Sequence, residues 1–124
     1  MKKIVIFLLL VFFLTFTTTS AQVDQTIVVQ NYYWAKEGKI DEVYAHRLYA
    51  SKVRDSLGLA VGRVLKRIGE NGELSHVIWE CEYNSEAARI EDVRLLTESR
   101  AFEKVTKKMG MLIYKFERGV YKVN

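Results

Sequence analysis

The spacing of apolar side chains changes several times along the chain, and each change marks the start of an expected element. Residues 26–34 are mostly β-branched and aromatic, which predicts a strand. From 40 to about 57 the spacing becomes that of an amphipathic helix, which Gly58 is expected to end. The apolar stripe of this helix is formed by Ile40, Val43, Tyr44, Leu48, Val53 and Leu57.

A β-hairpin is expected next. Residues 61–68 and 75–83 have the composition of strands. Between them lies Asn71-Gly72, the preferred pair for a two-residue turn, because both turn residues need positive φ. Such a turn fixes the register, because the numbers of facing residues must then add up to 143.

The rest of the chain predicts two further helical segments and a last strand. Asn84 or Ser85 is expected to cap the first of these helices. The expected elements are a helix over 86–98, a helical segment over 101–109 that Gly110 ends, and a strand over 111–123. The order βαββαβ favours a ferredoxin-like α+β sandwich, in which a four-stranded antiparallel sheet carries its helices on one face.

The predicted register sorts the side chains of the hairpin onto two faces. The helix side takes Val64, Val77, Trp79 and Cys81, with Gly62 leaving room beside Cys81. The other side pairs Arg63 with Glu80, Leu65 with Ile78 and Arg67 with His76. The charged row in HVIWECEYNS (76–85) is therefore interpreted as a cross-strand ladder, worth about 0.2–1 kcal/mol per pair. Because Leu65 and Ile78 lie among these charges, we expect a second copy to stack on this face as a homodimer.

The first 21 residues have the pattern of a cleaved signal peptide. Lys2 and Lys3 precede an apolar run, and Ala21 ends a stretch of small residues. The run is short for a membrane span of roughly 20 residues. We therefore expect export to the periplasm or cell exterior, no stable membrane insertion after cleavage, and a single domain over 22–124. Losing two lysines lowers the net charge from +4 to +2, which with export argues against nucleic acid as a partner.

Three segments resemble the dimeric α+β barrel superfamily, in particular its NIPSNAP-like and antibiotic-biosynthesis-monooxygenase-like domains. They are NYYWAKEGKIDEV (31–43), WECEYNSEAAR (79–89) and ESRAFEKV (98–105). The resemblance spans about Thr26 to Val123, and it implies a dimer that stacks two sheets into a barrel, with a pocket between each sheet and its own helices. Members range from cofactor-free oxygenases and haem proteins to proteins without known activity, so the fold alone does not assign the chemistry.

Haem is the one cofactor that the resemblance raises. Haem-degrading relatives use an asparagine on the first strand, a tryptophan near the pocket and a histidine on the second helix. Asn31 and Trp79 match the first two positions, but residues 85–109 contain no histidine. We therefore expect no cofactor, with haem as the lesser alternative. His46 and His76 lack a carboxylate at ligand spacing and predict no metal site.

Each candidate site residue has a structural alternative. His46 is expected at the edge or surface of its helix; pointing inward, it would be a candidate general base. Arg47 could bind an acidic ligand, although a solvated position is favoured. Cys81 is expected to be buried and unreactive. Most aromatic side chains are assigned to the core, and the alternative is a flat apolar pocket. The predicted ligand pocket consists of Tyr32, Tyr44, Trp79 and Tyr83, with His46 and Asn31 as catalytic residues.

Two functions fit this pattern. The first is a small-molecule enzyme, most plausibly a cofactor-free, monooxygenase-like activity on an aromatic compound. The second is a non-enzymatic domain that binds a small hydrophobic or aromatic ligand in the same pocket, or a protein partner. No set of residues converges as a catalytic constellation should, so both functions stay open at this point.

Overall fold

The structure is a computed structural model that describes residues 25–70 and 72–124. Its elements are β1 (Ile27–Ala35), α1 (Ile40–Ser56), β2 (Arg63–Lys66), β3 (Val77–Tyr83), α2 (Glu86–Glu98), α3 (Ala101–Leu112) and β4 (Ile113–Lys122). The predicted signal peptide, residues 1–21, lies outside the described residues. Within the described ranges, no helix is both long and apolar enough to cross a membrane.

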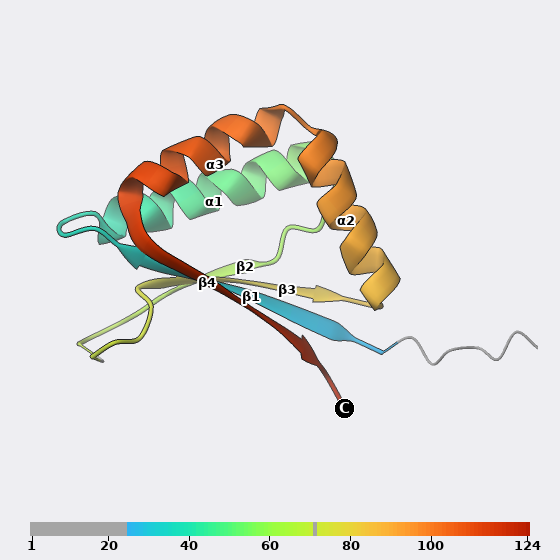
Figure 1. The fold of residues 1–124 in the computed structure, drawn as a ribbon, viewed down its shortest axis with the longest axis horizontal. Helices are drawn as coiled ribbons and strands as arrows, with labels where there is room; N and C mark the ends of the chain where they lie inside the picture. The colour runs from blue at the N-terminus through green and yellow to red at the C-terminus, as the bar shows by residue number, and fades with distance from the viewer. Residues whose placement is uncertain (1–24, 71) are drawn as a thin grey trace, which may run out of the picture.

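The sheet has the order β2-β3-β1-β4, and neighbouring strands are antiparallel. All three helices lie on one face, with α1 and α3 side by side and α2 at one end, so the other face carries no helix (Figure 1). This is the predicted ferredoxin-like arrangement, and the fold class is confirmed. The order places β1 in the middle and leaves β2 and β4 as edge strands.

The hairpin has the predicted register, although its strands are shorter than expected. Arg63 lies opposite Glu80, and Leu65 lies opposite Ile78, as the turn rule requires. Regular strand pairing stops at Lys66, although the backbone N–H of Arg67 still donates to the carbonyl oxygen of His76, its predicted partner, at 2.9 Å. Asn71, on which the predicted turn type rests, lies outside the described residues.

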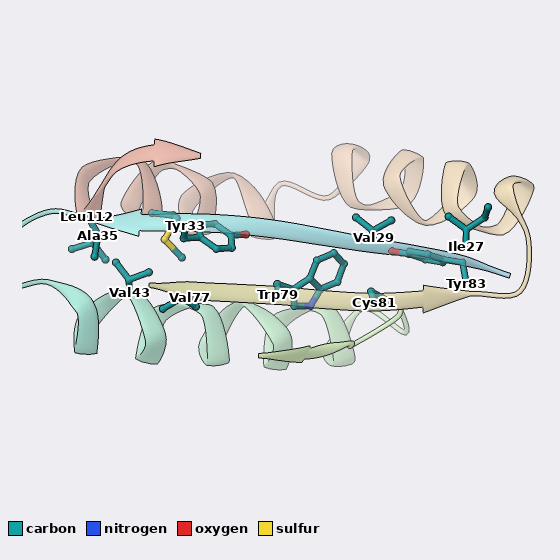
Figure 2. Packing of buried hydrophobic residues seen from close by; sticks show 11 residues of the cluster. Ile27, Val29, Tyr33, Ala35, Val43, Val77, Trp79, Cys81, Tyr83 and Leu112 are labelled. Atoms are coloured by element: carbon teal, nitrogen blue, oxygen red, sulfur yellow. The ribbon is translucent and has the colours of Figure 1, made fainter. Parts of the chain in front are cut away.

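The core lies between the sheet and the helices. Side chains on β1 and β3 alternate between a buried helix side and a more exposed opposite side, as a half-buried sheet requires. Figure 2 shows Val77, Trp79 and Cys81 from β3 beside Val29 and Tyr33 from β1. Burial of one such large apolar side chain stabilises the fold by about 1.5–3 kcal/mol.

The buried face of α1 differs from the predicted stripe. Leu48 and Leu57 were expected inside, yet they are 40% and 38% exposed. The side chains that α1 buries are Val43, His46, Arg47, Ala50, Ser51 and Arg54. Their spacing is helical, but most of them are polar, so apolar periodicity finds Val43 in the core and Ile40 and Tyr44 at its edge but misses the rest of the buried side.

The helix ends follow the local sequence in two cases of three. Ser85 caps α2 and accepts a hydrogen bond from the backbone N–H of Ala88 at 3.0 Å. Gly58 follows the end of α1 with φ +70°, as predicted. The expectation that Gly110 ends the next helix is wrong, because α3 continues to Leu112. Packing of buried Leu112 outweighs the cost of glycine inside a helix, about 1 kcal/mol.

Gly62 lets Trp79 reach its buried position. Its φ is +67°, and a Cβ there would lie 2.5 Å from the carbonyl oxygen of Glu80 and 2.7 Å from Nε1 of Trp79. The indole N–H donates to the carbonyl oxygen of Val61 at 2.9 Å. The space beside Gly62 is therefore filled by the indole and not by Cys81, contrary to expectation.

Replacing Gly62 by alanine should destabilise the domain by about 2–5 kcal/mol, because the left-handed conformation and the close contacts both oppose a Cβ. Gly58→Ala is the matched control: it has the same sign of φ, but nothing lies within 4 Å of a built Cβ. It should cost only about 1–2 kcal/mol. Urea unfolding of both variants measures the difference, and equal losses would contradict the close packing of Trp79.

Candidate functional site

Trp79 is the centre of a buried polar cluster beneath the helices. The residue is 2% exposed, and two guanidinium groups from α1 lie against its ring. The Cζ atoms of Arg47 and Arg54 are 4.7 Å and 4.5 Å from the ring centroid. Cation–π attraction at a desolvated site is worth about 2 kcal/mol, which helps to offset the cost of burying two cations.

Arg47 is therefore not on a solvated helix face, as expected, but is 2% exposed. Burial lowers the pKa of Arg47 to about 10, while a hydrogen bond with Tyr33 favours the charged form. The side chain remains a cation at neutral pH. Its Nε and Nη1 atoms have no hydrogen-bond partner within the described part of the chain.

Asp92 is the counter-ion of Arg54 and joins four parts of the fold. Its Oδ2 accepts from Nη1 of Arg54 at 2.8 Å and from the hydroxyl of Tyr83 at 2.7 Å. Its Oδ1 accepts from the backbone N–H of Ala60 at 3.1 Å. Asp92 thus connects α2 to α1, to β3 and to the segment before β2, and it is the only residue of α2 that is buried.

Tyr83 acts in this cluster as a hydrogen-bond donor. Burial and the hydrogen bond to Asp92 both raise the pKa of Tyr83 well above its usual value. The phenol is therefore protonated at neutral pH. It cannot serve as a base toward a ligand.

A cavity of about 660 Å³ opens above this cluster, between the sheet and helices α2 and α3. Asn31, Trp79 and Tyr83, three of the predicted site residues, all line it. The other lining residues are Val29, Arg54, Arg89, Val93, Leu96, Thr97, Ser99, Arg100, Phe102, Glu103, Thr106, Lys107 and Arg118. The volume falls within the range of small-molecule sites.

Asn31 positions a further arginine at this cavity. The two residues face each other across β1 and β4, and Nε of Arg118 donates to Oδ1 of Asn31 at 2.8 Å. Asn31 is buried, whereas Arg118 lies on an exposed edge strand. The amide of Asn31 therefore holds the guanidinium of Arg118 against the wall of the cavity.

His46 lies elsewhere and is buried, so the expectation of an edge or surface histidine is wrong. Its Nε2 lies 2.8 Å from the carbonyl oxygen of Val105, and since a carbonyl only accepts, Nε2 carries the proton. It lines a separate groove between α1 and α3, which shares no lining residue with the sheet–helix cavity. His46 and Asn31 are not brought together, and their catalytic roles stay predictions.

Two predicted pocket residues also lie outside the cavity. Tyr32 is on the sheet face without helices, where its hydroxyl lies 3.0 Å from that of Tyr121. Burial, followed by the interaction with Tyr121, raises the pKa of Tyr32 to about 12. Tyr44 packs at the edge of the core, with Nζ of Lys66 5.5 Å from its ring centroid.

The acidic row on β3 has the structural role that the register predicted. Glu80 makes a salt bridge with Arg63 at 2.6 Å and accepts a hydrogen bond from Gln30 at 2.6 Å. The hydrogen bond from Gln30 is the main cause that lowers the pKa of Glu80. His76 accepts a hydrogen bond at Nδ1 from the backbone N–H of Ala35 at 2.9 Å. Burial and nearby Arg67 lower the pKa of His76.

The residues present do not fit a haem with an axial histidine in this cavity. His46 and His76 both lie outside its lining, and each uses a ring nitrogen in a hydrogen bond to the backbone. Residues 25–70 and 72–124 also contain no group of three His, Cys, Asp or Glu side chains placed to hold a metal ion. Cys81 is buried as predicted, and burial raises the pKa of its thiol.

Sequence analysis missed three contributors to the site. Arg54 and Asp92 are charged residues on helices that apolar periodicity does not select, and Arg118 lies on an edge strand. The available signal was the register: β4 brings Arg118 opposite Asn31. The helical spacing of Arg47 and Arg54, seven residues apart on α1, was a second signal.

Comparisons with models of protein families and with curated proteins find no match. The structure is similar to that of a NIPSNAP family protein from Agrobacterium tumefaciens, with 22% identity, a TM-score of 0.62 and coverage of 82% of this chain and 88% of that chain. It is also similar to a dimeric ferredoxin-like protein of unknown function from Bacteroides fragilis, with 10% identity, a TM-score of 0.60 and coverage of 79% of this chain and 96% of that chain. A third similar structure is that of SnoaB, a cofactor-independent oxygenase from Streptomyces nogalater, with 15% identity, a TM-score of 0.55 and coverage of 81% of this chain and 93% of that chain. At these identities the likeness establishes the ferredoxin-like fold, not the chemistry.

Replacing Asp92 by alanine should destabilise the protein by about 3–5 kcal/mol, because it leaves Arg54 buried without a counter-ion. Glu91→Ala removes the neighbouring carboxylate, whose salt bridge with Arg94 is exposed, and should hardly move the unfolding midpoint. Urea denaturation of both variants tests this. A small loss for Asp92→Ala would show that the ion pair does not hold α2 in place.

Proposed function

We propose that the cavity between the sheet and α2–α3 binds a small hydrophobic or aromatic molecule. The observation that carries this proposal is the cavity itself, which offers about 660 Å³ beside the indole of Trp79. Val29, Val93 and Phe102 add apolar wall, and Asn31 and Arg118 add polar groups at one side. Apolar walls with a few convergent polar groups are typical of ligand sites.

Binding without turnover is favoured over catalysis. Asn31, the predicted orienting residue, is engaged with Arg118, and the hydrogen bond to Asp92 keeps Tyr83 protonated, so the cavity has no evident proton acceptor in either residue. His46, the predicted base, lines another groove. A cofactor-free, monooxygenase-like activity is the second candidate. It is supported by the likeness to a cofactor-independent oxygenase, in a cavity that can enclose an aromatic substrate.

We also propose that two copies pair through the sheet face that carries no helix. This face presents Leu65, which is 37% exposed, together with Ile78 and the ion pair of Arg63 and Glu80. A mixed surface of this kind is self-complementary under two-fold symmetry. Structural neighbours described as dimeric support this state.

Export of the chain remains our proposal for its location, on the basis of the apolar segment that precedes Gln22. The intact mass of protein recovered outside the cytoplasm tests it. A mass that still includes residues 1–21 would contradict cleavage.

Ligand binding can be followed with Trp79 as the reporter. The chain has two tryptophans, so Trp34→Phe leaves Trp79 as the only indole in the full-length sequence. Neutral phenylnaphthylamine should quench Trp79 emission and gain fluorescence itself, because its rings would lie against the indole. Titration of protein purified after expression of the full-length chain measures the affinity.

Two variants decide what this titration means. Phe102→Ala removes apolar wall from the cavity and should weaken phenylnaphthylamine binding by about tenfold. His46→Gln alters the groove between α1 and α3 and should leave the affinity for phenylnaphthylamine unchanged. If His46 were a catalytic base, the same substitution would lower the rate of turnover. No saturable binding to the wild type would overturn the proposed function.

Leu65→Arg should convert the dimer into monomers, because it places an extra charge in the centre of the proposed contact. Leu48→Arg is the matched control, since Leu48 is 40% exposed on the outer side of the helix layer. Sedimentation velocity over a concentration series measures both variants. A monomeric wild type, or a dimer that Leu65→Arg leaves intact, would contradict pairing through this face.

A further inference from the structure

The lining of the sheet–helix cavity has a marked excess of positive charge. Glu103 is the single acid among its lining residues. The cationic side chains are Arg54, Arg89, Arg100, Lys107 and Arg118, so five positive charges stand against one negative charge. A ligand that enters this cavity therefore meets a positive potential.

The excess is larger in this cavity than in three other hollows of the surface. The groove between α1 and α3 is lined by two lysines and one glutamate. The hollow on the open sheet face has two cationic and two acidic side chains. The hollow beside Gly62 has one cationic and two acidic side chains. A generally basic surface would have given all four hollows the same sign.

Protein carboxylates neutralise only part of this charge. Arg89 is paired with Glu86 and Arg54 with Asp92. Among residues 25–70 and 72–124, no salt bridge is made by Arg100, Lys107 or Arg118. Arg118 is instead fixed by the neutral amide of Asn31, which orients the guanidinium without cancelling its charge.

The buried arginines add an independent observation. Arg54 is 4% exposed and lines the cavity, and its Nε has no hydrogen-bond partner within the described residues. Arg47, which also lies against the ring of Trp79 but does not line the cavity, has two such nitrogen atoms. A buried donor without an acceptor destabilises the fold, and an anionic ligand atom beside Arg54 would supply the missing acceptor.

We propose that the ligand of this cavity is an acid: a hydrophobic or aromatic molecule that carries a carboxylate or a similar anionic group. The anion lies against Arg118 and Arg54, and the apolar part lies beside Trp79 and Phe102. This inference rests on the proposed function and adds the chemical class of the ligand. Planar oxyanions suit guanidinium groups, because both partners are flat and can form parallel hydrogen bonds.

Two fluorescent probes with the same rings test the charge directly. Anilinonaphthalene sulfonate carries an anionic group that phenylnaphthylamine lacks. The wild-type protein should bind the sulfonate at least about tenfold more tightly, because hydrogen bonds to charged groups contribute that much or more. Raising the ionic strength should weaken binding of the sulfonate and leave binding of the neutral probe nearly unchanged.

Arg118→Met keeps an apolar stem and removes the charge. This substitution should lower the affinity for the sulfonate by about tenfold to about a hundredfold and the affinity for the neutral probe far less. Arg94→Met is the matched control, because Arg94 is paired with Glu91 and Glu98 on α2 and does not line the cavity. It removes the same net charge and should change both affinities less than about twofold.

The outcomes separate this inference from the proposed function. Equal affinities for the two probes, or equal losses in Arg118→Met and Arg94→Met, would overturn the acidic ligand while leaving the cavity as a binding site. Failure of both probes to bind the wild type would overturn the proposed function as well. Selective loss of the sulfonate in Arg118→Met alone would support the assignment.

Discussion

The burial of Trp79 between two arginines is the constraint on which the rest of the structure depends. The indole can lie there only because Gly62 has no side chain, and the arginines can lie there only because the ring face attracts their charge. Arg54 in turn requires Asp92, which brings α2 over the sheet. The ion pair of Arg54 and Asp92 thus holds α2 on the sheet, whereas most amphipathic helices are held there by apolar packing.

This anchor explains why a cavity exists. Asp92 is the only buried residue of α2, whereas Ile90 is 56% exposed and Leu95 is 40% exposed. A helix held at one polar point need not press its apolar side onto the sheet, so Val93 and Leu96 line open space instead. A hydrophobic residue at 92 would leave Arg54 unpaired, and the buried charge would then oppose the fold.

The fold was predictable because its signals are local. Strand composition, the capping Ser85, Gly58 and the pairing of Arg63 with Glu80 all follow from neighbouring residues or from a fixed register. The site was less predictable, since it depends on which side of α1 faces inward. Apolar periodicity predicted that Leu48 points inward, yet Arg47 is buried instead. Arg47 is stabilised there by a cation–π contact with Trp79, thirty-two positions later in the chain, and no local pattern carries that information. His46 was misplaced for the same reason.

The two faces of the sheet divide two tasks between alternate residues of the same strands. On β1, Asn31 faces the cavity while Tyr32 faces the open side, and on β3 Trp79 and Glu80 divide in the same way. On the open face Arg63 and Glu80 form an ion pair within the chain, and this is the face proposed to pair with a copy of itself. In the cavity, Arg100, Lys107 and Arg118 make no salt bridge among the described residues, which is consistent with the proposed anionic ligand. Because a shift of one residue would exchange the two sets, the register that specifies the fold also specifies which side chains line the proposed binding cavity and which lie on the proposed pairing face.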